Sequence, residues 1–199
     1  MLNRLREFVK SILAGLMISI GGIVFLSTSD KTVGAFLFSC GLVSVVAFGF
    51  NLYTGRIGYV LENNKIFFID TVFSVFGNFL GCVLAGLVKS PIGNVVTVVQ
   101  NKLNKDLLTV FTDAVFCGIL IFVCVDIYKK KNTMLGILLC IPTFILCGFE
   151  HSVADMFYII NARLLNGYSL LFILIVILGN AAGGLIIPVC QKFYLKTKN

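Results

Sequence analysis

Long apolar runs alternate with short polar stretches along the whole chain. A helix needs about 20 mostly apolar residues to cross a bilayer, and most of these runs come close to that length. The polar stretches between them are too short to form a separate soluble lobe. We therefore predict an all-α membrane protein with six transmembrane helices, near residues 9–27, 33–50, 67–88, 107–127, 134–149 and 168–189.

Two short motifs recur about half a chain apart. The sequence GFN at 49–51 returns as GFE at 148–150, and GNFLG at 77–81 returns as GNAAG at 179–183. The two offsets nearly agree, which indicates one membrane unit present twice. Because each unit holds three spans, an odd number, the second unit must enter the membrane from the opposite side. The repeats are therefore expected to be inverted.

Composition agrees with a membrane protein that has no soluble lobe. Hydrophobic residues make up 58% of the 199 residues, charged residues make up only 13%, and mean hydropathy is +1.01. These values are typical of a chain that spans a bilayer. We predict a single transmembrane transporter domain over residues 1–199, with the inverted repeats at about 1–100 and 101–199. The seven cysteines lie singly in apolar runs, so we expect no metal site, disulfide framework or cofactor.

The basic residues are unevenly distributed between alternate loops. If the amino terminus is cytoplasmic, most of the 16 basic residues fall on the cytoplasmic side, as the positive-inside rule requires. We therefore predict a plasma (inner) membrane protein with both termini cytoplasmic, and we expect no nucleic-acid partner. The cytoplasmic set is Arg4, Arg6, Lys10, Arg56, Lys65, Lys129, Lys130, Lys131, Lys192, Lys196 and Lys198, and the outer set is Lys31, Lys89, Lys102, Lys105 and Arg163.

Polar residues interrupt the second and fifth apolar runs. The second run passes into 51–56 and the fifth into 150–155, and a shorter apolar stretch follows each interruption. Both helices are expected to break there. Backbone groups freed by a break cannot face hydrocarbon, so these segments must lie inside protein or along a wet cavity. The amino ends of the resulting half-helices carry partial positive charge, which favours an anion.

The second interruption begins with two adjacent ionisable residues, Glu150 and His151. Each ionisable group in a bilayer costs roughly 2.5–3.5 kcal/mol on insertion scales, so it needs a partner or a task. Adjacent residues on a helix point about 100° apart, so one can face a pore while the other holds the bend. We expect His151 to face the pore and Glu150 to hold the bend. The alternative is a purely structural network in which both residues cap the broken helix.

The segment GFEHSVADMF at 148–157 resembles the signature of the formate/nitrite transporter family. The similarity continues through LYTG at 52–55, FGNFLG at 76–81 and GNAAGG at 179–184, and it extends over all six predicted spans. The resemblance implies an aquaporin-like fold in which helices 2 and 5 are broken. It also implies a homopentamer with one pore in each subunit.

The resemblance further implies two apolar constrictions in the pore. On the matching positions, Phe38 and Leu42 form the cytoplasmic constriction, and Leu52 and Phe144 form the outer one. Taken without the family, all four are apolar helix residues whose commonest role is packing.

The polar pore residues are assigned in the same way. His151 is expected to stand between the constrictions, near Thr54, and Asn180 to complete the polar lining. Glu150 helps to hold the bend. The glycines around Asn180 and around Asn78 resemble small-residue packing sites that let helices approach closely.

An apolar constriction raises the question of how an anion passes. A bare charge in a dry constriction is strongly disfavoured relative to water. A weak-acid anion can be protonated at or near His151, cross as the neutral acid, and ionise again on the far side. Histidine suits this task because its ordinary pKa lies near physiological pH. We therefore predict transport of small monovalent anions such as formate, nitrite, hydrosulfide or short monocarboxylates, together with a proton.

Two positions depart from the family pattern in the fourth span. Asp106 falls where the family usually has a lysine in the outer vestibule, with Lys105 one residue away, so the lysine has either shifted register or been lost. Phe122 occupies a place often held by asparagine, which removes a polar partner beside the vestibule.

Two other classes of function are weighed against an anion transporter. Glu150, His151 and Ser152 are residue types found in the active sites of hydrolases, so an intramembrane hydrolase with Ser152 as the nucleophile is one alternative. Adjacency alone does not form a catalytic triad, however, and no separate element supplies an oxyanion site. We therefore do not expect an enzyme. An aquaporin-like pore for small neutral solutes is the main alternative, although it leaves a histidine on the pore axis less well explained.

Overall fold

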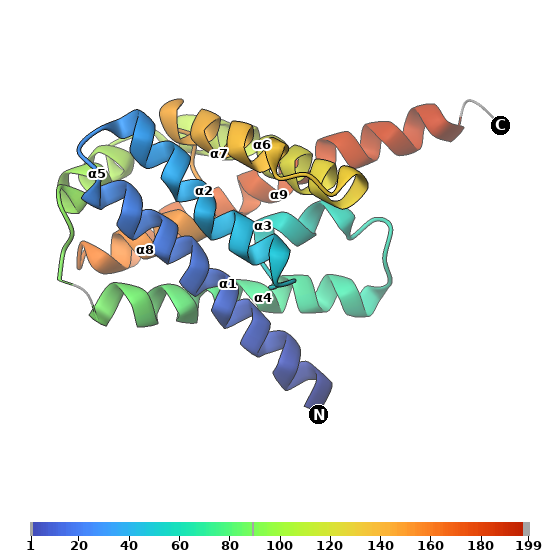
Figure 1. The fold of residues 1–199 in the computed structure, drawn as a ribbon, viewed down its shortest axis with the longest axis horizontal. Helices are drawn as coiled ribbons and strands as arrows, with labels where there is room; N and C mark the ends of the chain where they lie inside the picture. Colours follow the sequence, from blue (N-terminus) through green and yellow to red (C-terminus); the bar gives the residue numbers. More distant parts are fainter. Residues whose placement is uncertain (1, 89, 197–199) are drawn as a thin grey trace.

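The computed structural model describes residues 2–88 and 90–196, which form helices joined by short connections (Figure 1). No strand occurs within these ranges, so the predicted all-α class is confirmed. Two basic residues of the predicted charge sets, Lys89 and Lys198, lie outside the described residues. The elements are α1 (Leu2–Ser27), α2 (Lys31–Ala47), α3 (Tyr53–Arg56), the 3-10 turn η1 (Ile57–Tyr59), α4 (Lys65–Val88), α5 (Val95–Leu103), α6 (Leu107–Lys131), α7 (Leu135–Leu146), α8 (Ser152–Asn161) and α9 (Gly167–Lys196).

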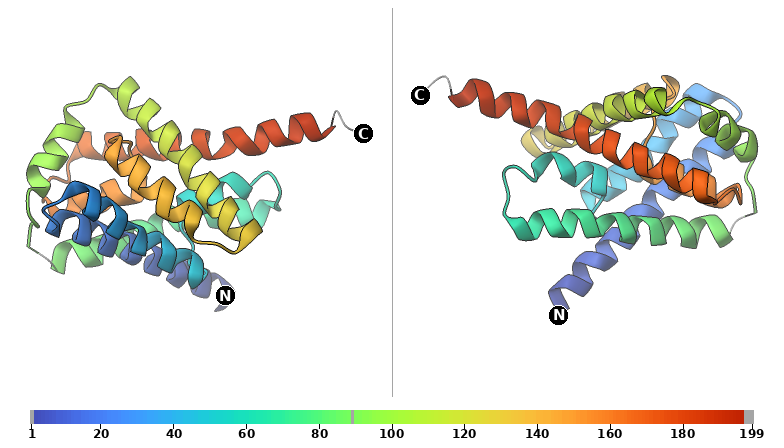
Figure 2. Two further views of the ribbon diagram at one scale, coloured as in Figure 1. Left: turned by 45° about the horizontal axis from the view of Figure 1, so that its top comes forward. Right: turned by 180° about the vertical axis from the view of Figure 1, so that it is seen from behind.

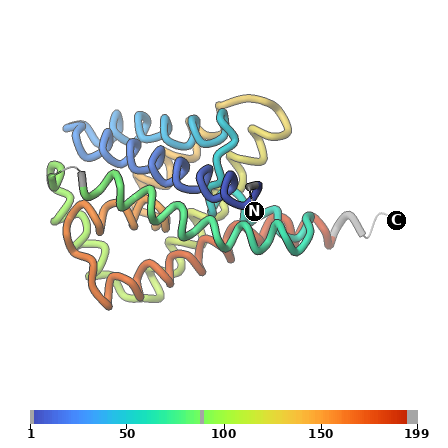
Figure 3. Tube along the Cα trace, turned by 90° about the horizontal axis from the view of Figure 1, so that it is seen from below, coloured from blue at the N-terminus to red at the C-terminus, as the bar shows by residue number. Residues whose placement is uncertain are grey.

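Five of the described helices, α1, α2, α4, α6 and α9, are long and apolar enough to cross a membrane, and α7 is a shorter apolar helix. They cover the six predicted runs. Large apolar side chains such as Phe73, Phe76 and Leu108 are more than half exposed on their outer faces. Such a surface suits a hydrocarbon solvent. The C-terminal part of α9 extends beyond the other helices (Figure 3).

Glycines bring two helix pairs into close contact, α1 with α4 and α6 with α9 (Figure 2). A Cβ atom added to Gly81 on α4 would lie 2.2 Å from the Ile12 carbonyl oxygen on α1. A Cβ added to Gly183 on α9 would lie 2.0 Å from the Val115 carbonyl oxygen on α6. Only glycine fits where two helix backbones approach this closely. The recurring GN motifs therefore mark the tightest crossings.

The short helix α5 lies in a region that the apolar pattern treats as a loop. Its residues Val95 and Val99, one helical turn apart, are fully buried, and α5 packs against α8. The helix has only nine residues, too few to register as a span. It matters for the site because it carries Lys102.

Candidate functional site

The chain leaves helical geometry at two places that become the framework of the site. The first connection, residues 48–52, joins α2 to α3, and the second connection, residues 147–151, joins α7 to α8. Gly49 and Gly148 have φ angles of +65° and +71°. This left-handed conformation is readily adopted by glycine and ends a helix without strain. The recurring glycine of the two motifs thus allows the helix to end at each connection.

A buried asparagine satisfies the backbone of the first connection. Asn78 on α4 accepts a hydrogen bond from the Tyr53 N–H at 2.9 Å. Its amide group donates to the carbonyl oxygens of Asn51, at 2.9 Å, and Ser11, at 2.7 Å. The side chain therefore joins the amino end of α3 to α1.

Asn180 on α9 makes the same set of bonds at the second connection. It accepts from the Ser152 N–H at 2.9 Å and donates to the carbonyl oxygens of Glu150, at 2.9 Å, and Ala114, at 2.8 Å. All of its hydrogen-bonding atoms are thus directed at the backbone, and the residue is fully buried. The prediction gave Asn180 a place in the polar lining. The structure instead places it behind the connection, because the freed backbone groups need its amide.

His151 and Thr54 meet at the centre of the molecule. Thr54 Oγ1 lies 2.9 Å from His151 Nε2, and both residues are almost fully buried. His151 Nδ1 accepts a hydrogen bond from the Ala154 N–H at 3.2 Å and caps α8. Because Nδ1 acts as an acceptor, the neutral ring carries its proton on Nε2 and donates it to the Thr54 hydroxyl. The hydroxyl hydrogen is then free to point elsewhere.

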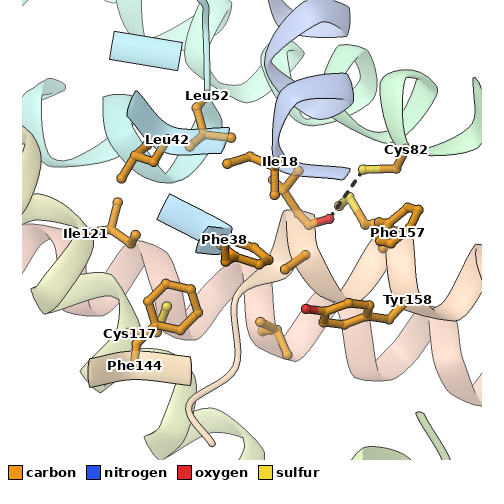
Figure 4. Packing of buried hydrophobic residues seen from close by; sticks show 14 of the residues in the cluster. Ile18, Phe38, Leu42, Leu52, Cys82, Cys117, Ile121, Phe144, Phe157 and Tyr158 are labelled. Carbon is orange, nitrogen blue, oxygen red and sulfur yellow. Dashed lines mark hydrogen bonds between the residues drawn. The ribbon is translucent and has the colours of Figure 1, made fainter. Parts of the chain in front are cut away.

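Apolar side chains surround this polar pair. The rings of Phe38 and Phe144 lie edge to face with centroids 6.1 Å apart, and Phe144 also stacks on His151 at 5.7 Å. Leu42 and Leu52 lie next to each other (Figure 4) and line one cavity together. All four apolar residues are buried. The pairs are thus Phe38 with Phe144 and Leu42 with Leu52.

This pairing corrects the predicted one, in which Phe38 was grouped with Leu42, and Leu52 with Phe144. Phe38 and Leu42 are one turn apart on α2, which separates them by about 6 Å along the helix axis. They therefore cannot form a constriction at one level.

Two cavities approach the central pair from opposite sides. The first cavity, about 440 Å³, is lined by Phe144, His151 and a group of charged and polar residues: Lys31, Lys102, Lys105, Glu150, Asp155 and Tyr158. The second cavity, about 240 Å³, is lined by Leu42, Leu52, Gly55, Arg56 and Lys129 among others.

Phe122 lines neither of these cavities. Its ring packs on Tyr59, with centroids 5.5 Å apart, and a Cβ added to Gly58 would lie 2.3 Å from it. Phe122 therefore does not line the first cavity, although the prediction placed it beside the outer vestibule. Lys105 precedes the first residue of α6 and Phe122 follows Lys105 by 17 residues, so more than half of α6 lies between them.

An ion-pair cluster lies at the wall of the first cavity. It consists of Lys102, Lys105, Glu150 and Asp155, which line the cavity, and of Asp113, which pairs with Lys105 behind them. Lys102 forms an ion pair with Glu150, and its Nζ lies 3.0 Å from Asp155 Oδ1. Lys105 Nζ lies 2.7 Å from Glu150 and 2.7 Å from Asp113. Glu150 and Asp155 are buried, so these lysines supply the charge compensation that a buried carboxylate requires.

The two lysines stay charged in this setting. Burial alone would lower the pKa of Lys105, but its hydrogen bonds to Asp113 and Glu150 outweigh burial and raise that pKa. The same balance holds at Lys102, where burial is opposed by Asp155 and Glu150 and the pKa is raised.

Asp106 has a structural position beside the cluster. Its carboxylate accepts from the Thr109 N–H at 2.9 Å and from the Thr109 hydroxyl at 2.6 Å, and it caps the amino end of α6. These bonds, led by the hydroxyl, lower the pKa of Asp106. Lys105, one residue earlier, reaches the first cavity. The structure thus favours a register shift of the lysine over its loss.

Sequence reasoning missed Lys102 and Asp155 as site residues. Asp155 follows His151 by four positions, which puts both on one face of α8. That spacing was the available signal. Lys102 gave none, because it lies on α5 and reaches the site only through the packing of α5 on α8.

A model of the formate/nitrite transporter family matches residues 2–194. The chain belongs to the formate/nitrite transporter family. It is 29% identical over 187 residues to the formate channel FocA of Escherichia coli K12, a match that covers 78% of this chain. The chain spans 65% of the length of that relative. It is also 27% identical over 245 residues to a probable formate transporter of Methanothermobacter thermautotrophicus, covering 97% of this chain and 89% of the relative.

Two solved structures share the fold of this formate/nitrite transporter family member. A structure described as an FNT family ion channel superposes with a TM-score of 0.85 at 23% identity, covering 97% of this chain and 91% of the other. A pentameric formate channel with formate bound gives a TM-score of 0.76 at 21% identity, covering 99% and 98%. The predicted family is confirmed, and it is a family of membrane transport proteins and not of enzymes.

Proposed function

We propose that this chain is a channel-type transporter for small monovalent weak-acid anions, such as formate, nitrite or hydrosulfide, with proton coupling at His151. The observation that carries the proposal is the Thr54–His151 pair, buried between apolar side chains at the point where the two cavities approach each other. Two of the relatives are named for formate transport, which supports the substrate class.

The two cavities offer cationic groups to an anion on either side of the apolar zone. Lys31, Lys102 and Lys105 line the first cavity, and Arg56 and Lys129 line the second. An anion gains electrostatic stabilisation in each cavity but loses it between the buried rings of Phe38 and Phe144. Protonation near His151 removes the charge, and the neutral acid passes the apolar zone at a far smaller cost in free energy.

We propose six spans in two inverted repeats, at about 1–100 and 101–199, within one domain. In this arrangement α2 continues into α3 and η1 as a broken second helix, and α7 continues into α8 as a broken fifth helix, as in an aquaporin-like fold. The matching bonds of Asn78 and Asn180 support the repeat. Both termini are proposed to be cytoplasmic and the protein to lie in the plasma (inner) membrane, because most basic residues then follow the positive-inside rule.

We also propose a homopentamer with one pore in each subunit. The support is the pentameric formate channel whose fold the chain shares, together with apolar side chains exposed on the outer faces of the helices. Chemical cross-linking in mild detergent should give a ladder that ends at five subunits. A ladder that ends at one or two subunits would contradict the pentamer but would leave the proposed pore within each subunit unaffected.

The transport function is tested in proteoliposomes that contain the full chain. We expect labelled formate or nitrite to enter faster when the outside is acidified. His151→Asn should remove this pH dependence and slow uptake about tenfold or more, because a hydrogen bond to a charged group contributes about 1.5–3 kcal/mol and 1.4 kcal/mol is tenfold.

Empty vesicles and glycerol-induced swelling provide the controls. Swelling by glycerol with formate uptake that ignores pH would favour the neutral-solute pore instead. Anion uptake that His151→Asn leaves unchanged at every pH would contradict proton coupling at His151.

A further inference from the structure

Asp155 is the residue of the first cavity whose chemistry the proposed function leaves unused. Its side chain is 1% exposed and lines the cavity one helical turn from His151. Lys102 Nζ lies 3.0 Å from Oδ1, yet neither carboxylate oxygen accepts a well-aligned hydrogen bond within the described residues. A buried carboxylate normally receives several hydrogen bonds. This one depends on a single ammonium group for compensation.

That ammonium group is shared. Lys102 also pairs with Glu150, and Glu150 in turn shares Lys105 with Asp113. The cluster therefore sets three carboxylates, Asp113, Glu150 and Asp155, against two lysines. One negative charge is in excess when every group is ionised. A substrate anion that enters the first cavity competes with these carboxylates for the two lysines. Lys31 lines the same cavity but forms no ion pair with the cluster among the described residues.

The other titratable groups around Asp155 do not supply a cation. The Cys117 thiol on α6 and the Tyr158 phenol on α8 lie within electrostatic reach of the same carboxylates. From α4, the Cys82 thiol donates to the Val153 carbonyl oxygen at 3.3 Å. His151 is engaged by Thr54 and by the Ala154 N–H. Among the described residues, Lys102 alone forms an ion pair with Asp155.

We propose that Lys102 and Asp155 couple anion binding to proton uptake, a step that rests on the proposed anion transport and specifies how the proton enters. The anion binds the Lys102 ammonium group and replaces Asp155 as its ion-pair partner. Asp155, now without a counterion and beside a new negative charge, binds a proton from water in the open cavity. Anion and proton thus bind together, because each favours the other by linkage.

The proton then leaves with the substrate. The O–H bond on Asp155 breaks as an O–H bond forms on the bound anion, directly or by way of His151 one turn away. The neutral acid departs through the apolar zone, and Asp155 returns to the carboxylate form. Lys102, released by the substrate, pairs with it again. Charge and protons balance over the cycle, since one anion and one proton enter and one neutral acid leaves.

The test measures protons bound when formate binds, using the detergent-solubilised full chain in weakly buffered solution with a pH-indicator dye. For the wild type we expect uptake of about one proton per formate bound near neutral pH. Asp155→Asn keeps the size and shape of the side chain but cannot titrate, so it should lose most of this uptake while still binding formate. The matched control is Asp126→Asn, since Asp126 is a lysine-paired carboxylate on α6 that lines neither cavity.

The outcomes separate this coupling from the proposed function. Wild-type proton uptake retained in Asp155→Asn overturns the role of Asp155, and so does formate binding by the wild type without any proton uptake. In both cases anion transport itself stands. If calorimetry detects no binding of formate or nitrite to the wild type and vesicles show no uptake, the transport function fails and the coupling fails with it.

A second measurement can overturn the proposal on the wild type alone, and the variants then assign the signal to a residue. Formate-induced infrared difference spectra should contain a band of a protonated carboxyl group that shifts in heavy water. The band should be present in Asp126→Asn and absent in Asp155→Asn. A wild-type spectrum without such a band overturns the proposal.

Discussion

The first and second connections are held in the same way but carry different chemistry. In each, a glycine with positive φ follows the end of a helix, and an asparagine from a distant helix bonds one N–H group and two carbonyl groups. The side chains between these fixed points differ. Leu52 of the first connection corresponds to His151 of the second, because each lies three residues after the glycine of its motif.

The charged groups near the two connections also differ in kind and in number. Near the first, Arg56 lies 3.7 Å from Glu7 and bonds Asn51, and its guanidinium group stacks over the Phe67 ring. Near the second, three carboxylates face two lysines. Backbone satisfaction inside a membrane is thus a requirement that both connections meet alike. Titratable chemistry is concentrated at the second.

The largest loss of stability is expected from substitutions at the glycines where α1 crosses α4 and α6 crosses α9. Gly81→Val and Gly183→Val should each destabilise the fold by several kcal/mol, because an added Cβ would meet a backbone carbonyl oxygen that cannot move away. Thermal unfolding in detergent is the measurement. Gly167→Ala is the control, since a Cβ at Gly167 meets nothing within 4 Å. A severe loss at only one crossing would break the equivalence of the two helix pairs.

A somewhat smaller effect is expected from the asparagines. Asn78→Ala and Asn180→Ala each leave an N–H and two carbonyl groups without their partner, at a cost on the order of 3 kcal/mol. We expect similar drops in unfolding temperature for the two variants. Asn101→Ala, on α5 at the rim of the first cavity, is a control of the same residue type. A silent Asn78→Ala would show that the first connection is held by other contacts.

The smallest expected effect is a difference in how the unfolding temperature depends on pH when a charged group near the first or the second connection is removed. The pKa of Lys105 is raised, so its ion pairs stabilise the fold fully below the ordinary lysine pKa of about 10.4 and are lost as pH rises through the raised value. Lys105→Met should lower the unfolding temperature at neutral pH and reduce its further fall in alkali. Arg56→Gln should leave the alkaline fall unchanged, because a guanidinium group does not titrate there. Equal alkaline curves for wild type and Lys105→Met would contradict this assignment.

Apolar runs and recurring motifs predicted the long helices and both connections, because hydrocarbon burial and backbone satisfaction act through local sequence. The helix α5 was missed, since nine amphipathic residues carry no span signal. The resemblance grouped Phe38 with Leu42 and Leu52 with Phe144, whereas in the structure Phe38 packs on Phe144 and Leu42 and Leu52 line the same cavity. These neighbours depend on how α2 packs against α7, which local sequence does not specify. The contact of Lys102 with Asp155 was beyond sequence reasoning, as it arises only when α5 packs on α8.

The positions of the two asparagines in the chain set an order of assembly during translation. Asn78 is synthesised 102 residues before Asn180, so the first connection can mature earlier than the second. Asn180 lies on α9, the last helix described, and until it arrives the Ser152 N–H and the Glu150 carbonyl lack their partner. The nascent segment around His151 must therefore wait in the insertion machinery, or against another hydrogen-bonding surface, until synthesis has passed residue 180.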